Sequence, residues 1–206
     1  MEQRSEEWFA ARAGKFTGSR FSDLMARTKS GYGAAYYNLL TTLAVERITG
    51  QCVPTYTNAA MQHGIDTEPD ARFAYECQTG RVVDEVAFVN HPELSHVGVS
   101  PDGLVGDDGL IEIKCPYSMH KHMEALTKGS HAAEYRWQVQ GQLWVTGRNT
   151  CDVVSYDSRF PEGLQLAIVT VERNQDDIKA LADAVREAEN KVMELVEQMN
   201  TIRKAA

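Results

Sequence analysis

The sequence predicts an α/β fold in which a mixed central β-sheet is flanked by helices. The spacing of apolar residues changes from helical to strand-like near residue 81, returns to helical near 119, and alternates again between 151 and 171. Helices before, between and after two groups of strands are typical of a sheet covered on both faces. The 206 residues are enough for one substantial core. Since no repeat or convincing linker divides them, we expect a single domain over residues 1–206.

Capping residues and apolar periodicity define the individual elements. Ser5 and Gly14 bound a short first helix, and Thr17 or Ser19 can cap a second. Because proline is tolerated in a first helical turn, Pro69 places Glu68 near a helix start. The expected order is these two helices, a loop at 29–33, a helix at 34–49, an interrupted helical region at 58–79, strands at 81–90, 96–99 and 110–114, helices at 119–126 and 131–145, strands at 151–156 and 166–171, and a helix at 175–204.

One stretch, Ser100 to Pro116, combines acidic residues with strand and turn signals. Glu112 and Lys114 are two positions apart in a strand-like alternation, so they share one face while the isoleucines between and before them pack on the other. The Gly-Asp-Asp-Gly at 106–109 favours a chain reversal. Asp102 should therefore return to lie beside Glu112.

Two converging carboxylates and one ammonium suit divalent-metal chemistry. Carboxylates this close repel each other unless a cation lies between them, and hard oxygen donors suit Mg²⁺ or Mn²⁺. A lysine at the rim can orient or deprotonate a water, or offset charge developing on a phosphate. An isolated E-x-K is usually a surface ion pair, but the apolar neighbours here indicate a buried strand, which does not carry charges without partners. Phosphodiester hydrolysis needs these groups.

The composition restricts the class of protein. The formal net charge of −8 argues against a simple nucleic-acid-binding module, whose surface is usually basic, although residues 12–29 contain five basic residues against one acid. The four cysteines form no C-x-x-C pair, which argues against a zinc site. No apolar run approaches the ~20 residues of a membrane span, and the N-terminus lacks the apolar core of a signal peptide. We therefore expect a cytoplasmic protein.

The pattern PD-x(9)-E-x-K is the signature of the PD-(D/E)XK nuclease superfamily. S-P-D-G-L followed by E-I-K-C-P resembles, more specifically, the phage lambda-type exonuclease or viral recombinase family. Similar segments follow in the same order along nearly the whole chain: Trp8, Arg12-Ala-Gly and Thr17-Gly-Ser19, then His63 to Phe73, and Trp137 to Thr146. The resemblance implies a restriction-endonuclease-like fold, with N-terminal helices at 5–50 forming a DNA-end pocket and channel, a catalytic core at about 58–173 and a C-terminal helix at about 175–204.

The resemblance also implies an activity. Family members are Mg²⁺-dependent exonucleases that degrade one strand of linear duplex DNA from the 5′ end, prefer a 5′-phosphate and release 5′-mononucleotides, with Mn²⁺ as an expected substitute. They act in recombination with a single-strand annealing protein, and three subunits form a ring around the DNA. By resemblance we expect a phage or prophage protein of the bacterial cytoplasm. A ring would fit the acidic total, because enclosing the DNA replaces part of the affinity of a basic surface.

The same resemblance assigns roles to individual residues at a site of two metal ions. Asp102, Glu112 and the backbone carbonyl of Ile113 would hold one ion. Glu68, with Asp102, would complete the coordination. Lys114 would position the attacking water, and Gln138 would help to orient it.

A second group of residues would bind the terminal phosphate. Arg12 and Ser19 lie at expected helix ends, where exposed amides attract anions, although the residues alone favour a surface arginine and an ordinary cap. With Ser100, they match the family's pocket for the 5′-phosphate. A basic residue of the adjacent loop, Lys29 or Arg27, is expected to assist. The family aligns an arginine near Lys29, and a lysine there loses the bidentate geometry.

Other interpretations stay open. A structure-specific or restriction-type endonuclease would share the metal site without the end-binding pocket, and it would cleave closed circular DNA. A catalytically silent DNA-binding assembly subunit would keep the fold and release no nucleotides. A calcium loop at 102–108 is excluded, because the EF-hand ligand spacing and its final glutamate are missing.

Overall fold

The main β-sheet carries Glu112 on one of its inner strands, and Asp102 comes directly before another. The computed structural model describes residues 1–29, 31–54 and 56–205. Within these ranges the main sheet has the strand order β10-β9-β8-β7-β4. Strands β8 and β9 are parallel and the other neighbours are antiparallel, which confirms the mixed sheet. The strands are β4 (Val83–Asp84), β7 (Gly103–Val105), β8 (Gly109–Lys114), β9 (Thr150–Tyr156) and β10 (Leu166–Glu172).

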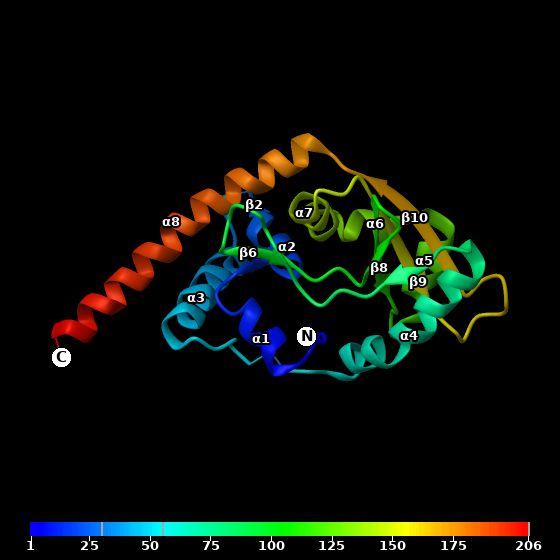
Figure 1. Ribbon diagram of the computed structural model, residues 1–206, viewed down its shortest axis with the longest axis horizontal. Coiled ribbons are helices and arrows are strands. Elements are labelled where there is room, and N and C mark those ends of the chain that lie inside the picture. Colours follow the sequence, from blue (N-terminus) through cyan, green and yellow to red (C-terminus); the bar gives the residue numbers. More distant parts are fainter. Residues whose placement is uncertain (30, 55, 206) are drawn as a thin grey trace.

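Helices surround this sheet and make up most of the N-terminal part (Figure 1). Ser5 caps the first helix as expected, because its hydroxyl accepts a hydrogen bond from the Trp8 amide. The helix expected at 131–145 is split into two at Tyr135. The helices are α1 (Glu6–Arg12), the 3-10 turn η1 (Gly18–Arg20), α2 (Phe21–Met25), α3 (Ala34–Thr49), α4 (Ala59–Thr79), α5 (Met119–Lys128), α6 (Ser130–Glu134), α7 (Arg136–Thr146) and α8 (Gln175–Ala205).

Strand β8 is covered on both faces, as its apolar alternation predicts. Ile111 and Ile113 pack with Tyr75 of α4 on one side. Leu110 packs with Leu143 of α7 on the other side, which is also the side of Glu112. The strand is therefore buried, and its charged side chains need polar partners.

Helix α4 corrects the expectation of an interrupted helical region. It is one 21-residue helix with Pro69 inside it. Proline at this position forfeits the hydrogen bond to the Ile65 carbonyl. The helix persists because its N-terminus is capped by Asn58, whose side chain accepts from the Met61 amide, and because Tyr75 is buried against the sheet. Glu68 therefore lies in the middle of a helix and not near its start.

The strand expected at 81–90 is also corrected. It is two short strands in different sheets: β4, and β5 (Val89–Asn90), which pairs with β6 (Val97–Val99). Between them the backbone bonds to side chains instead of a neighbouring strand, since Gln3 donates to the Val86 carbonyl and Trp8 to the Ala87 carbonyl. Strand β6 also pairs in parallel with β1 (Phe16–Thr17), which no sequence pattern predicts.

A second core joins the N-terminal helices to α8. Phe21, Leu43 and Leu181 belong to one buried cluster, and α8 lies along α3 in Figure 1. Buried positions on α8 run from Asp177 to Val192. The final turns project from the body of the molecule (Figure 1).

The loop expected at 29–33 contains part of a small hairpin. Strands β2 (Arg27–Thr28) and β3 (Gly31–Tyr32) pair antiparallel. Ser30, between them, lies outside the described residues. Across the part of the chain that the structure describes, every helix is too short or too polar to cross a membrane.

Candidate active site

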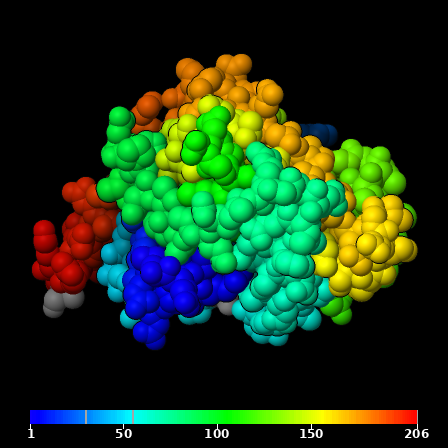
Figure 2. All heavy atoms as spheres, turned by 45° about the vertical axis from the view of Figure 1, so that its right-hand side comes forward, coloured from blue at the N-terminus to red at the C-terminus, as the bar shows by residue number. Residues whose placement is uncertain are grey.

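A cavity of about 820 Å³ opens beside β8, and most of the predicted site residues line it. The N-terminal segment and α4 lie next to each other on one face of the molecule (Figure 2), and Arg4 Nη2 lies 2.9 Å from Oε2 of Glu68. The predicted residues that line the cavity are Arg12, Ser19, Glu68, Ser100, Asp102, Glu112, Ile113, Lys114 and Gln138.

The β7–β8 hairpin brings Asp102 to β8, as the turn chemistry predicts. Gly103 pairs with Ile111 across the hairpin, and the amide of Ile113 donates to Asp102 Oδ2 at 2.6 Å. Continuing the register would place Pro101 opposite Ile113, and proline has no N–H to offer. Because the N–H and C=O of a strand residue point to the same edge, the Ile113 carbonyl is directed toward the Asp102 side.

Glu112 is buried, with 2% of its surface exposed, and both of its carboxylate oxygens accept hydrogen bonds. Oε1 lies 2.5 Å from Lys114 Nζ and 2.6 Å from Gln138 Nε2. Oε2 accepts from Gln142 Nε2 at 2.6 Å. The sequence motif assigns no role to Gln142. Its signal is the spacing of four from Gln138, which places both amides on one face of α7.

Lys114 is held as an ammonium against the carboxylates. Its Nζ lies 4.1 Å from the centre of the Tyr135 ring. Burial opposes the charged form, but the negative charges of Glu112 and Asp102 outweigh burial and raise the pKa of Lys114.

Asp102 experiences the repulsion that close carboxylates predict. Burial raises its pKa well above the ordinary value, and the charge of Glu112 raises it further. Lys114 and the Ile113 amide act in the opposite direction without cancelling these effects. A cation beside Asp102 and Glu112 would relieve this repulsion.

The donor chemistry of Asp102, Glu112 and the Ile113 carbonyl fits a hard cation such as Mg²⁺, since all three offer oxygen. Glu68 lines the same cavity, but its oxygens lie 2.9 Å from Arg4 Nη2 and 3.2 Å from Arg72 Nη2. Within residues 1–29, 31–54 and 56–205, no three His, Cys, Asp or Glu side chains are grouped closely enough to hold a metal ion. For Glu68 to bind an ion together with Asp102, the ion would have to replace Arg4 at Oε2 of Glu68.

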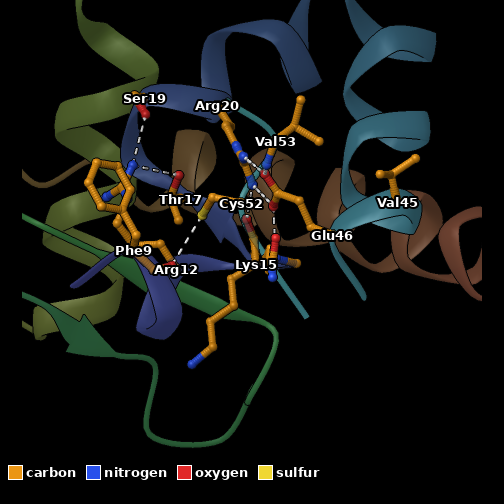
Figure 3. Close-up of polar contacts among 12 residues, drawn as sticks. Phe9, Arg12, Lys15, Thr17, Ser19, Arg20, Val45, Glu46, Cys52 and Val53 are labelled. Carbon is orange, nitrogen blue, oxygen red and sulfur yellow. Dashed lines mark hydrogen bonds and ion pairs between the residues drawn. The ribbon is translucent and has the colours of Figure 1, made fainter. Parts of the chain in front are cut away.

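Arg12, Ser19 and Ser100 also line the cavity, and hydrogen bonds from Arg12 bring them together. Arg12 Nη1 donates to Ser100 Oγ at 3.2 Å. Its Nη2 donates to Thr17 Oγ1 at 3.3 Å and to Ser19 Oγ at 3.4 Å (Figure 3). The guanidinium carbon of Arg12 lies over the Trp8 ring, 4.1 Å from its centre. Burial and the nearby charge of Arg20 lower the pKa of Arg12 to about 10. A guanidinium surrounded by hydroxyl groups is suited to bind a phosphate.

Arg27 and Lys29 do not line the cavity. Arg27 Nη1 donates to the Leu24 carbonyl at 3.0 Å, and its guanidinium lies 3.8 Å from the centre of the Tyr32 ring. Lys29 is exposed. Their contact with a terminal phosphate stays a prediction.

Comparison with known proteins gives a family and a fold. The model of the YqaJ-like viral recombinase domain matches residues 7–149. The chain is similar to the crystal structure of an alkaline exonuclease, LHK-Exo, from Laribacter hongkongensis, with 41% identity over 98% of this chain and 100% of that chain and a TM-score of 0.89. The LHK-Exo complex with dAMP matches with the same values.

A more distant structure shares the fold alone. The phage related exonuclease from Haemophilus somnus 129PT is 16% identical over 90% of this chain and 96% of that chain, with a TM-score of 0.73. The comparison with curated proteins finds no match.

Proposed function

Because this chain belongs to the YqaJ-like viral recombinase domain family, we propose that it is a DNA exonuclease that acts in recombination. In finer terms, it degrades one strand of linear duplex DNA from the 5′ end, depends on Mg²⁺, and releases 5′-mononucleotides. One observation carries the proposal: the carboxylates of Asp102 and Glu112, the ammonium of Lys114 and the Arg12 guanidinium line a single cavity.

The carboxylates and Lys114 in the cavity supply the groups for phosphodiester hydrolysis. Asp102, Glu112 and the Ile113 carbonyl would hold Mg²⁺, or Mn²⁺ in its place. When bound, such an ion stabilises negative charge on the phosphate and promotes ionisation of water. Lys114 orients the attacking water as a hydrogen-bond donor and offsets charge on the phosphate oxygens. Gln138 holds the side chains of Lys114 and Glu112 in place relative to each other, since its amide contacts both.

Glu68 would serve a second ion together with Asp102. Both line the cavity, and the negative charge of Glu68 contributes to the raised pKa of Asp102. The Arg4 contact to Glu68 is part of the exposed surface, with 43% of the Arg4 side chain accessible. Ion pairs with an exposed partner contribute little free energy, so a cation can replace Arg4 at Oε2 of Glu68 at modest cost while Arg72 stays at Oε1.

The second group in the cavity, Arg12, Ser19 and Ser100, would bind the terminal phosphate. A doubly ionised 5′-phosphate accepts more and stronger hydrogen bonds from Arg12, Ser19 and Ser100 than an internal diester does. The presence of dAMP in a structure of the similar LHK-Exo supports a mononucleotide product. We propose that Arg27 or Lys29 adds to the positive potential when DNA is bound.

The proposed assembly is a homotrimeric ring around linear duplex DNA, which works with a single-strand annealing protein in the cytoplasm of a bacterial host. A net charge of −8 is compatible with DNA held by enclosure. Light scattering tests the ring: three times the 23.0 kDa of one chain is expected, and a monomer in the presence of DNA would exclude it.

The test of the activity uses purified protein with Mg²⁺ and linear duplex labelled at either the 5′ or the 3′ terminus. Labelled mononucleotide should appear at once from the 5′ label, and the 3′ label should stay in long strands. Closed circular duplex should remain intact. Cleavage of the circle would indicate an endonuclease, and the absence of any nucleotide release would indicate a silent DNA-binding subunit.

A further inference from the structure

A buried carboxylate lies directly behind the proposed phosphate pocket. Glu46, in the last turns of α3, is fully buried, with 0% of its surface exposed. Arg20 donates to it through two nitrogens, Nη1 to Oε2 at 2.8 Å and Nη2 to Oε1 at 2.5 Å. The amides of Gly14 and Val53 donate to it at 2.8 and 3.1 Å. Figure 3 shows this group beside Arg12 and Ser19.

The segment that follows Arg12 is held by these bonds. The Gly14 amide donates to Glu46, and the Lys15 carbonyl accepts from Arg20 Nη1 at 3.0 Å. The Gly14 carbonyl accepts from Arg47 Nε at 2.8 Å. The turn that ends α1 is therefore tied to α3, and the direction of the Arg12 side chain depends on that turn.

The opposite side of the pocket is tied to the same carboxylate. Ser19 and Arg20 are adjacent in η1, so the two-pronged pairing of Arg20 with Glu46 sets the position of the Ser19 hydroxyl. Arg12 donates to Ser19 across the gap between α1 and η1. One carboxylate thus connects both elements that supply the pocket.

Glu46 also controls the charge around the pocket. The positive charge of Arg20 lowers the pKa of Arg12, and the negative charge of Glu46 acts in the opposite direction. The pairing leaves Arg20 directed at Glu46 and Lys15, while every hydrogen bond described for Arg12 goes to a hydroxyl group. Of Arg12 and Arg20, Arg12 is thus the one whose guanidinium is available to a phosphate.

We propose that Glu46 is a positioning residue for the recognition of 5′-phosphorylated DNA ends, acting through Arg20 and the Gly14 turn on Arg12 and Ser19. This inference rests on the proposed function, since it concerns the same phosphate pocket. Glu46 touches neither DNA nor the reacting atoms. It makes the pocket selective by holding its donors in place before the DNA end arrives.

The experiment compares wild type with Glu46→Gln, which keeps the side-chain shape and removes the charge. Fluorescence anisotropy in EDTA measures binding to a duplex with a 5′-phosphate and to one with a 5′-hydroxyl. The ratio of the two affinities should fall roughly tenfold in the variant, a loss typical of a charged hydrogen-bond partner. With Mg²⁺, KM for the phosphorylated duplex should rise while kcat changes much less. An unchanged affinity ratio would overturn the inference.

A matched control separates positioning from general loss of stability. Asp152 is also a buried carboxylate, 4% exposed, and accepts from Arg81 Nη1 and the Tyr75 hydroxyl, both at 2.6 Å. It does not line the cavity. Asp152→Asn should lower thermal stability and leave the affinity ratio unchanged; a fall equal to that of Glu46→Gln would assign the effect to stability and overturn the inference.

A second variant decides the question if Glu46→Gln does not fold. Arg20→Lys keeps the charge but loses the two-pronged geometry, so it should lower the affinity ratio as well, and an unchanged ratio would overturn the inference. Arg12→Ala tests the proposed function separately, because it should erode the preference for 5′-phosphorylated over 5′-hydroxyl ends. If wild type shows no preference for the phosphorylated end, the proposed function fails in this respect. If wild type and Arg12→Ala behave as expected and the Glu46 and Arg20 variants keep the wild-type ratio, only the inference fails.

Discussion

Lys114 Nζ lies 2.5 Å from Glu112 Oε1, and both side chains extend from the same face of β8. Gln138 joins them, since its Nε2 donates to Glu112 and its Oε1 lies 3.5 Å from Lys114 Nζ. The contact with Glu112 keeps Lys114 charged and directs its ammonium into the cavity next to Asp102. The relationship explains why the lysine is expected to act on water and phosphate as a donor.

Replacing Lys114 should affect turnover far more than binding. In Lys114→Ala the donor for water and phosphate is lost, so kcat should fall on the order of 100-fold or more. Affinity for duplex DNA, measured by anisotropy in EDTA, should change little. The control is Lys128→Ala, which removes an exposed lysine paired with Glu124 at 3.4 Å on α5. Unchanged turnover in Lys114→Ala would reject the role of this lysine.

The hydrogen bond from Gln142 should stabilise the Glu112 carboxylate and hold it in place. Gln142→Leu leaves Oε2 of Glu112 without its donor in a buried place, which should cost about 1–3 kcal/mol of folding stability and reduce kcat. Urea unfolding and steady-state kinetics measure the two effects. Gln140 is buried on the same helix but bonds to the Glu172 carbonyl and the Asn174 amide. Gln140→Leu should lose stability and keep kcat; equal kinetic losses in both variants would contradict the assignment.

Gly14 should not tolerate a side chain. Its φ of +70° is unfavourable for other residues, and a Cβ would lie 2.6 Å from Arg47 Cγ. Gly14→Ala should therefore lower Tm and weaken the preference for a 5′-phosphate. Gly80 has a similar φ of +68° with nothing within 4 Å of its Cβ position, so Gly80→Ala isolates the backbone cost. Equal shifts of Tm in the two variants would contradict a steric effect at Gly14.

The stabilising effect of Glu46 should disappear in acid. Burial raises the pKa of Glu46, but hydrogen bonds from Arg20 and the Gly14 amide lower it below the ordinary value of 4.5. A carboxyl with a lowered pKa in the folded state stabilises the fold above the unfolded value and loses this effect as the pH falls through the folded value. The difference in free energy of unfolding between wild type and Glu46→Gln should be constant above pH 5 and shrink below pH 4.5. A difference independent of pH would contradict it.

The positions of Asp102, Glu112 and Lys114 could be predicted because their relationship is local. A tight reversal and a strand with a period of two are sufficient to bring them together. The surroundings of Glu68 could not be predicted in this way. Its partner Arg4 is 64 positions away, and Arg4 reaches it through the packing of the N-terminal segment against α4. Local spacing contains no information about such a contact.

Two local rules led to wrong expectations because tertiary contacts outweighed them. Pro69 would normally interrupt a helix, yet burial of Ala71 and Tyr75 in the core keeps α4 continuous. The apolar run at 81–90 has strand character, but side chains of the N-terminal segment donate hydrogen bonds to the backbone carbonyls in its middle. Its two ends therefore pair in two different sheets. The role of Gln142 could not be predicted for a related reason. The sequence does not indicate that this amide donates to Glu112, which lies 30 positions away.

Diffraction from crystals soaked in Mn²⁺ would show whether the carboxylates hold a metal ion, because the anomalous signal locates the ion without any assay of activity. We expect a peak within coordination distance of Asp102, Glu112 and the Ile113 carbonyl, and its loss in Asp102→Asn. A crystal that takes up Mn²⁺ elsewhere while these carboxylates bind none would contradict it.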